Sequence, residues 1–241
     1  MSRITKLPPP APIVAVRFCG TGGQGLVLMG KLLAEAAAIH AGLNVVQTKS
    51  YGPEARGGAS RSDVVLSSGD IDDLGGLATD ILVCLSQQAC DKFYPDMAPQ
   101  GVLLTDSSNV GVVPTSRAVE LPITATAQDV CKNKMVANVV GLGALCGLTQ
   151  IVPFSALEAA VRAAVKPAFH ELNLQALKAG YDLAQSDRRV VPGSAIARTW
   201  DFGYLHPHAQ PAKPAKAKAK PAAKPASQLV AEAKAKAKAK P

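Results

Sequence analysis

A glycine-rich turn near the start of the chain carries the clearest chemical signal. Its spacing is G-x-G-x-x-G, and its six residues are Gly20, Thr21, Gly22, Gly23, Gln24 and Gly25. A β-branched run precedes the turn and an Ala- and Leu-rich run follows it, so a strand leads in and a helix leads out. Glycines allow close backbone approach, and the free N–H groups at a helix start attract anions. The turn predicts contact with a phosphorylated ligand, although the same spacing also serves plain packing of a strand against a helix.

A dinucleotide site would need one more group, a carboxylate that binds the ribose hydroxyls at the end of the second strand. That strand is expected at 43–48, and Lys49 follows it where Asp or Glu would be required. Lys49 favours a phosphate, so a freestanding NADP oxidoreductase remains an alternative. A different phosphorylated ligand, or a partner subunit, fits the turn better.

A second glycine-rich segment comes directly after Lys49 and reads SYGPEARGG. Arg56 can hold two oxygens of a carboxylate or phosphate at once, and Glu54 can orient its guanidinium. The segment is predicted to contact a ligand or a partner subunit, and a surface loop with an internal Arg–Glu pair is the alternative. Its candidate contact residues are Tyr51, Glu54, Arg56, Gly57 and Gly58.

The two segments together resemble the gamma subunit, or gamma domain, of 2-oxoacid:ferredoxin oxidoreductases. The exact form of the second segment is more similar to the 2-oxoglutarate branch of that family than to the pyruvate branch. A third stretch, KMVAN at 134–138 with GLGA at 141–144, is similar to another motif of the family. It departs at Lys134, where the family usually has Asn. The resemblance covers about residues 12–185.

The resemblance implies a role within a larger enzyme. Such enzymes decarboxylate a 2-oxoacid on thiamine diphosphate, pass electrons through iron–sulfur clusters to ferredoxin, and form an acyl-CoA. This chain would be a non-catalytic gamma subunit beside alpha and beta catalytic subunits and a ferredoxin-like iron–sulfur subunit. Its glycine turn and second segment would contact coenzyme A or those subunits. The same complex acting on pyruvate or a branched-chain 2-oxoacid is an alternative.

The cysteines favour placing the metal and thiamine chemistry on the partners. The chain has five cysteines and no C-x-x-C pair, so neither an iron–sulfur cluster nor a structural zinc site is indicated. It also lacks a thiamine-diphosphate motif, so thiamine diphosphate, Mg and the clusters are expected on partner subunits. An odd number of thiols is typical of a reduced, cytoplasmic protein, and no apolar run is long enough to span a membrane.

The net charge of +8 is concentrated at one end of the chain. Residues 207–241 hold nine Lys and one acidic residue, so the rest of the chain is neutral. A neutral body argues against a nucleic-acid-binding face outside the tail. A nucleotide-dependent regulator with a nucleic-acid-binding tail is nevertheless kept as an alternative of another class. Ala, Lys and Pro cannot form a core, so the tail is expected to be disordered.

The motifs need a scaffold, and the apolar runs predict one of the α/β class. Alternation of strand and helix indicates a Rossmann-like, mostly parallel sheet covered by helices on both faces. The first two strands are expected to pair in parallel through the helix between them. Strands are predicted at 13–19, 43–48, 62–67, 79–85, 101–105 and 119–121, and helices at 26–41, 87–94, 124–132, 135–149, 154–165 and 169–185.

The same composition divides the chain into four parts. A Pro-rich lead-in occupies 1–12, and the gamma-type domain is expected at 13–187. An extension at 188–206 holds the only Trp, and the basic tail fills 207–241. The candidate functional residues all lie in the second part.

Overall fold

A computed structural model describes residues 13–50, 58–72, 74, 76–116 and 118–186 of the chain. The predictions for the lead-in at 1–12, the extension at 188–206 and the tail at 207–241 lie outside these residues. So do the predictions for Tyr51, Glu54, Arg56 and Gly57.

The described residues form one six-stranded sheet with the strand order β2-β3-β1-β4-β5-β6. β1 pairs in parallel with β4, β4 with β5, and β5 with β6, whereas β3 is antiparallel to both β1 and β2. The predicted α/β class and mostly parallel sheet are therefore confirmed. The strands are β1 (Ile13–Thr21), β2 (Asn44–Ser50), β3 (Ala59–Ser67), β4 (Thr79–Cys84), β5 (Met97–Asp106) and β6 (Val119–Leu121).

The expectation that the first two strands pair with each other was wrong. β1 and β2 run in the same direction, but β3 lies between them and hydrogen-bonds to both. Only eight residues connect Ser50 to Ala59, whereas a crossover between parallel strands needs a dozen or more. The chain after β2 must therefore turn back as an antiparallel neighbour, and β3 fills the position that β2 was predicted to occupy.

The helices agree closely with the prediction, and the differences lie at their ends. The helix expected at 26–41 is α1 followed by a π-helical turn at Ala36–His40, and the helix expected from 135 starts two residues later, after a 3-10 turn at Lys134–Val136. The helices are α1 (Leu26–Glu35), α2 (Gln87–Phe93), α3 (Ile123–Cys131), α4 (Ala137–Thr149), α5 (Phe154–Ala164) and α6 (His170–Ser186).

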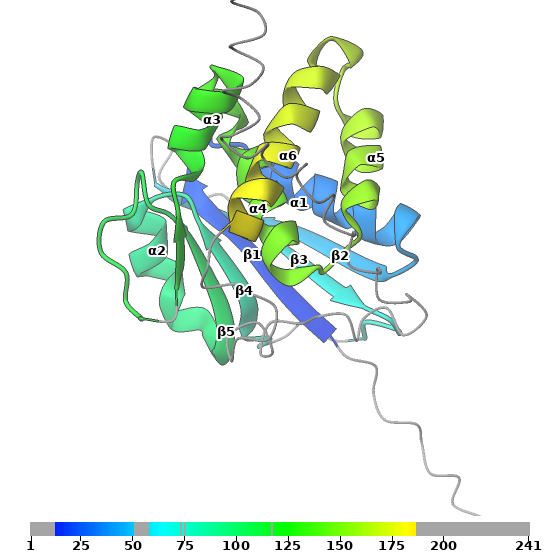
Figure 1. Cartoon of the computed structure of the whole chain (residues 1–241). Helices are drawn as coiled ribbons and strands as arrows, with labels where there is room; N and C mark the ends of the chain where they lie inside the picture. Colours follow the sequence, from blue (N-terminus) through cyan, green and yellow to red (C-terminus); the bar gives the residue numbers. More distant parts are fainter. Residues whose placement is uncertain (1–12, 51–57, 73, 75, 117, 187–241) are drawn as a thin grey trace, which may run out of the picture. The chain divides into compact units, whose positions relative to one another are not determined.

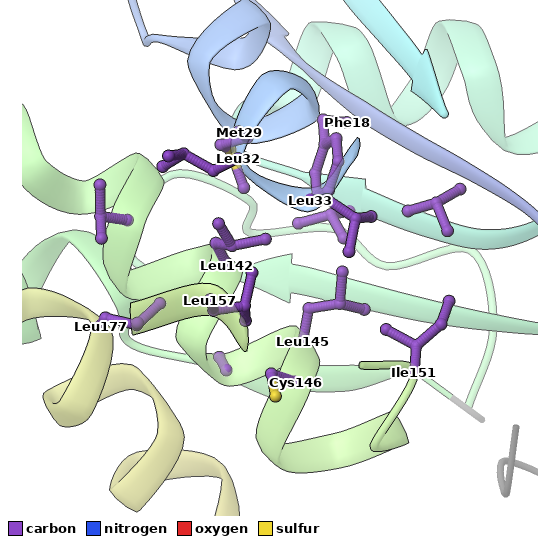
Figure 2. Close-up of a cluster of buried hydrophobic side chains, with 14 of the residues drawn as sticks. Phe18, Met29, Leu32, Leu33, Leu142, Leu145, Cys146, Ile151, Leu157 and Leu177 are labelled. Atoms are coloured by element: carbon purple, nitrogen blue, oxygen red, sulfur yellow. The ribbon is translucent and has the colours of Figure 1, made fainter. Parts of the chain in front are cut away.

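Apolar side chains are buried on both faces of the sheet. On one face, the larger cluster joins Val16 and Phe18 of β1 to α1, α3, α4, α5 and α6, and Figure 2 shows Phe18, Leu142 and Leu157 within it. On the other face, a smaller cluster joins the neighbouring Cys19 to α2. The two clusters take alternate residues of β1, because successive strand side chains point to opposite faces. α2 thus packs on the face of the sheet opposite to α1 (Figure 1).

α4 and α6 approach each other at glycines. A Cβ on Gly143 would collide with the carbonyl oxygen of Leu177, and a Cβ on Gly180 would collide with that of Val140. Small residues at such positions let two helix backbones come closer than side chains otherwise allow. This contact holds α4 in place, and the first turn of α4 carries a residue that contacts the glycine turn.

Candidate functional site

The glycine turn is fastened to the neighbouring strand by the side chain of Gln24. Its Oε1 accepts a hydrogen bond from the backbone N–H of Thr21 at 2.7 Å, and its Nε2 donates to the carbonyl oxygen of Leu85 at 3.1 Å. Leu85 follows β4, so one side chain ties the end of β1 to the end of β4. Gln24 was predicted to contact a ligand, and the structure gives it this internal role in shaping the turn.

The four glycines of the turn are not equivalent. Gly23 and Gly25 have φ values of 91° and 75°, a region that other residues rarely adopt. A Cβ on Gly20 would meet the Gln24 side chain, and one on Gly25 would meet Asn138. Gly22 differs from all three, because a Cβ there would meet nothing within 4 Å and its φ lies outside the left-handed region. Among the described residues, nothing therefore requires glycine at 22.

The turn lies where the sheet changes winding direction. The chain leaves β1 into α1 on one face of the sheet and leaves the adjacent β4 into α2 on the other face. In open α/β sheets, ligands bind outside the carboxyl ends of strands at such a switch point. Gly25 caps α1 without a side-chain hydrogen bond, and no acidic residue lies in the first turn of α1. The first N–H groups of α1 are therefore not covered by a capping side chain.

A cavity of 260 Å³ borders the turn on the side of β3. Arg61 is the charged residue in its lining, and sequence reasoning missed it. Its Nε lies 3.2 Å from Asp63 Oδ2, out of line for a hydrogen bond, and its guanidinium stands 5.5 Å from the ring centroid of Phe93. Asp63 also pairs with the buried Arg17 at 2.6 Å. Arg61 is thus anchored by the fold and already partly neutralised. The cavity is lined by Thr21, Gly22, Gly23, Gly25, Leu26, Val27, Ser60 and Arg61.

A second cavity, of 240 Å³, lies on the other side of the turn, at the ends of β1, β4 and β5. Five separate stretches of the chain meet there, and most of its side chains are polar. The lining residues are Gly23, Gln24, Leu85, Asn109, Thr124, Lys134, Met135, Ala137 and Asn138. This cavity, called the switch-point cavity below, is the candidate site where the glycine turn meets the third motif.

Asp106 organises one wall of the switch-point cavity. It is fully buried at the end of β5, and its carboxylate accepts hydrogen bonds from Asn109 Nδ2 at 2.7 Å and from Thr124 Oγ1 at 2.5 Å. The backbone N–H groups of Ser108 and Thr124 also donate to it, at 3.1 and 3.2 Å. Asn109 and Thr124 are therefore held rigidly toward the cavity. Residues 106–109 are Asp, Ser, Ser and Asn, which favour turns, and a buried strand that ends in such a turn is the signal that could have indicated this wall.

The third motif forms the opposite wall. Asn138, only 4% exposed, donates from Nδ2 to the carbonyl oxygen of Gly25 at 3.3 Å, so the motif and the glycine turn touch directly. Asn133 caps the 3-10 turn, with its Oδ1 accepting from the N–H of Met135 at 2.9 Å. Lys134, where the family resemblance departs, lines the cavity. The sequence placed this motif on a helix, and the structure brings it to the glycine turn.

The remaining predicted residues lie along the same end of the sheet. Gly58 precedes β3, whose Ala59 is paired with Thr21, so it lies beside the glycine turn. Lys49 is exposed on the edge strand β2, two strands from the turn, and lines neither cavity described above. Structure therefore supports grouping Gly58 with the turn and separates Lys49 from it.

The five cysteines are free thiols in the apolar interior. Cys19 Sγ and Cys84 Sγ are 3.2 Å apart, and their contact raises the pKa of Cys84. Burial raises the pKa of Cys146 to about 12. Thiols with raised pKa values stay protonated at neutral pH and are poor nucleophiles and metal ligands. In the part of the chain that the structure describes, no three His, Cys, Asp or Glu residues are grouped to hold a metal ion, and no helix is long and apolar enough to cross a membrane.

The fold and the site define a Rossmann-like binding domain whose glycine turn stands at the switch point of its sheet. The chain belongs to the family described as pyruvate ferredoxin/flavodoxin oxidoreductase, which matches residues 15–183. The resemblance inferred from the three motifs is thereby confirmed. Family membership favours an oxidoreductase subunit over the regulator and the NADP enzyme that the sequence left open.

Known relatives and solved structures agree with this family. The chain is 44% identical over 177 residues to the 2-oxoglutarate synthase subunit KorC of Methanocaldococcus jannaschii, covering 70% of this chain and 93% of that one. It matches the gamma subunit of a keto/oxoacid ferredoxin oxidoreductase from Geobacter sulfurreducens with a TM-score of 0.66 and 43% identity, over 72% and 97% of the two chains. It also matches the 2-oxoglutarate:ferredoxin oxidoreductase of Magnetococcus marinus, solved with 2-oxoglutarate, coenzyme A and succinyl-CoA bound, with a TM-score of 0.64 and 25% identity, over 71% of this chain and 31% of that one.

Proposed function

We propose that the chain is the gamma-type, non-catalytic subunit of a 2-oxoglutarate:ferredoxin oxidoreductase. The complex would convert 2-oxoglutarate and coenzyme A to succinyl-CoA and CO₂, and pass the two electrons released to ferredoxin. The similarity to the KorC subunit supports this substrate, because it extends over 93% of that subunit and reaches 44% identity. The form of the second segment at 50–58 points the same way.

The other cofactors belong to partner subunits in this proposal. These partners are alpha and beta catalytic subunits and a ferredoxin-like iron–sulfur subunit, which would hold thiamine diphosphate, Mg and the clusters. The thiols of this chain do not fit a cluster, since they are buried in the core and several have raised pKa values. Free thiols are also typical of a reducing compartment, so we place the complex in the cytoplasm.

The open space around Gly22 is the main support for a contact with coenzyme A. No described residue explains the missing side chain at this position, yet cavities lie on both sides of the turn. Close approach of an outside group explains it, and coenzyme A offers phosphates suited to the uncapped start of α1. Tyr51, Glu54, Arg56 and Gly57 stay in the proposal on the strength of their motif.

Replacing Gly22 by Ala in the assembled complex tests this contact. The chain should unfold at an unchanged temperature, because the new methyl group has no described protein atom within 4 Å. The KM for coenzyme A should rise by about tenfold, a change of ~1.4 kcal/mol in binding, and Gly22→Val should raise it further. The KM for 2-oxoglutarate serves as the internal control and should stay constant. Normal coenzyme A kinetics for both variants would make the turn an ordinary scaffold.

A further inference from the structure

We infer that Val112 and Met135 form a docking contact through which the catalytic part of the complex closes the switch-point cavity. This inference rests on the proposed function in one respect, since that function supplies the partner. It assigns a surface that neither the glycine turn nor the coenzyme A contact explains.

Exposure singles out these two side chains. Met135 is 76% exposed and Val112 is 72% exposed, more than any other large hydrophobic residue among those the structure describes. Single exposed apolar residues are common on protein surfaces. Here one of the two lines the switch-point cavity and the other is three residues from its lining residue Asn109. Exposed apolar residues rimmed by polar ones mark interaction sites.

One residue lines the switch-point cavity, and the other lies on the loop that leaves one of its walls. Met135 lines it directly, from the 3-10 turn before α4. Val112 follows β5 in the chain, three residues after Asn109, which lines the opposite wall. Val112 thus lies on the loop that leaves the carboxyl end of β5, and Met135 lies at the cavity beside the glycine turn.

Both residues are also held rigidly. The amide of Gln87 makes three hydrogen bonds to the Val112 loop: Oε1 accepts from the N–H groups of Gly111 and Val112, each at 3.0 Å, and Nε2 donates to the carbonyl oxygen of Val112 at 2.9 Å. The cap that Asn133 provides fixes Met135. An apolar residue on a fixed backbone loses less conformational entropy on binding than one on a mobile loop. The surface is thus preorganised for a partner.

The occupant that fits best is the catalytic part of the complex. In the Magnetococcus marinus enzyme, the matching fold makes up only 31% of its chain, so the domain accompanies other structure within that chain. The polar walls of the cavity would act on a ligand more strongly once water is excluded, and a covering subunit supplies that exclusion. A second copy of this chain fits less well, because a two-fold contact centred on Met135 would bring the exposed Lys132 and Lys134 of each copy together.

Charge substitutions at the two positions test the inference in the full-length chain. Met135→Glu and Val112→Glu should each weaken association with the purified catalytic subunits at least tenfold, as is typical of a buried interface anchor. Ile39→Glu is the matched control. Ile39 is 69% exposed, but it lies in the π-helical turn after α1, toward the other end of the sheet, so association should stay within twofold. All three variants should keep the melting temperature, since the side chains are exposed.

Sedimentation velocity of the chain with and without the catalytic subunits measures each outcome. Native-like association of both Met135→Glu and Val112→Glu would overturn the inference, and so would an equal loss with Ile39→Glu. Loss of a homodimer with unchanged binding to the catalytic subunits would assign the surface to a second copy and overturn it as well. The result is separable from the proposed coenzyme A contact. Gly22→Ala should change coenzyme A kinetics in a complex that still assembles, whereas these variants should weaken assembly itself.

Discussion

Two regions of the molecule contain several glycines: the contact between α4 and α6, and the turn after β1. The reasons for glycine differ between the two regions. Gly143 and Gly180 are explained within the chain, because a Cβ on either would collide with a carbonyl of the facing helix. Gly22 has no such explanation, and Gly23 is explained by its backbone angle alone. The space available for a Cβ atom therefore distinguishes glycines that the fold requires from a glycine that a bound ligand or partner would explain.

The largest effect should follow a change at the helix contact. Gly→Ala inside a helix normally stabilises a protein by about 0.5–1 kcal/mol. Gly180→Ala should do the opposite and cost about 1–3 kcal/mol, because the methyl group forces the backbones of α4 and α6 apart. Thermal unfolding should show a fall of about 2–12 °C in Tm for a domain of this size. A stabilised Gly180→Ala variant would show that the close contact is not a packing requirement.

An intermediate effect is expected at Gly23, and the chain offers a matched control for it. Gly23 and Gly42 both have positive φ, 91° and 70°, and a Cβ on either meets nothing within 4 Å. Ala at either position should cost about 1–2 kcal/mol of stability from backbone strain alone. Only Gly23→Ala should also raise the KM for coenzyme A in the assembled complex. Equal kinetics for the two variants would indicate that strain is the only role of Gly23.

The smallest effect on stability should be at Gly22, where the free energy of unfolding should change by less than about 0.5 kcal/mol. If the stability is unchanged, a clear rise in the KM for coenzyme A must reflect a lost contact with the ligand and not a change in the fold. A destabilised Gly22→Ala variant would place Gly22 with Gly143 and Gly180 as a structural glycine.

Much of the fold could be predicted, because apolar runs and chain breakers mark local elements. The helix at 26–41 was expected from its Ala- and Leu-rich run, and Pro153 and Pro167 mark the breaks before α5 and before α6. The pairing of β1 with β3 was missed, since strand order depends on how the chain returns after β2. The clue lay in the eight residues between Ser50 and Ala59, a connection too short for a parallel crossover.

The candidate site was predicted in part, for a similar reason. The glycine turn and its position between a strand and a helix followed from local spacing. The wall built by Asp106 and the contact between Asn138 and Gly25 did not, because these residues are far apart in sequence and meet only when the sheet forms. Arg61 was missed because a single Arg on a strand carries no spacing signal.

The central claim, that this chain serves a 2-oxoglutarate-specific complex without catalysing alone, is tested most directly by reconstitution. The chain should be purified with and without the catalytic and iron–sulfur subunits of its own organism, and ferredoxin reduction should be followed with coenzyme A and either 2-oxoglutarate or pyruvate. We expect no turnover by the chain alone, and a kcat/KM for 2-oxoglutarate that exceeds that for pyruvate by at least about tenfold, or ~1.4 kcal/mol. Turnover by the isolated chain, or a preference of the complete complex for pyruvate, would contradict the account.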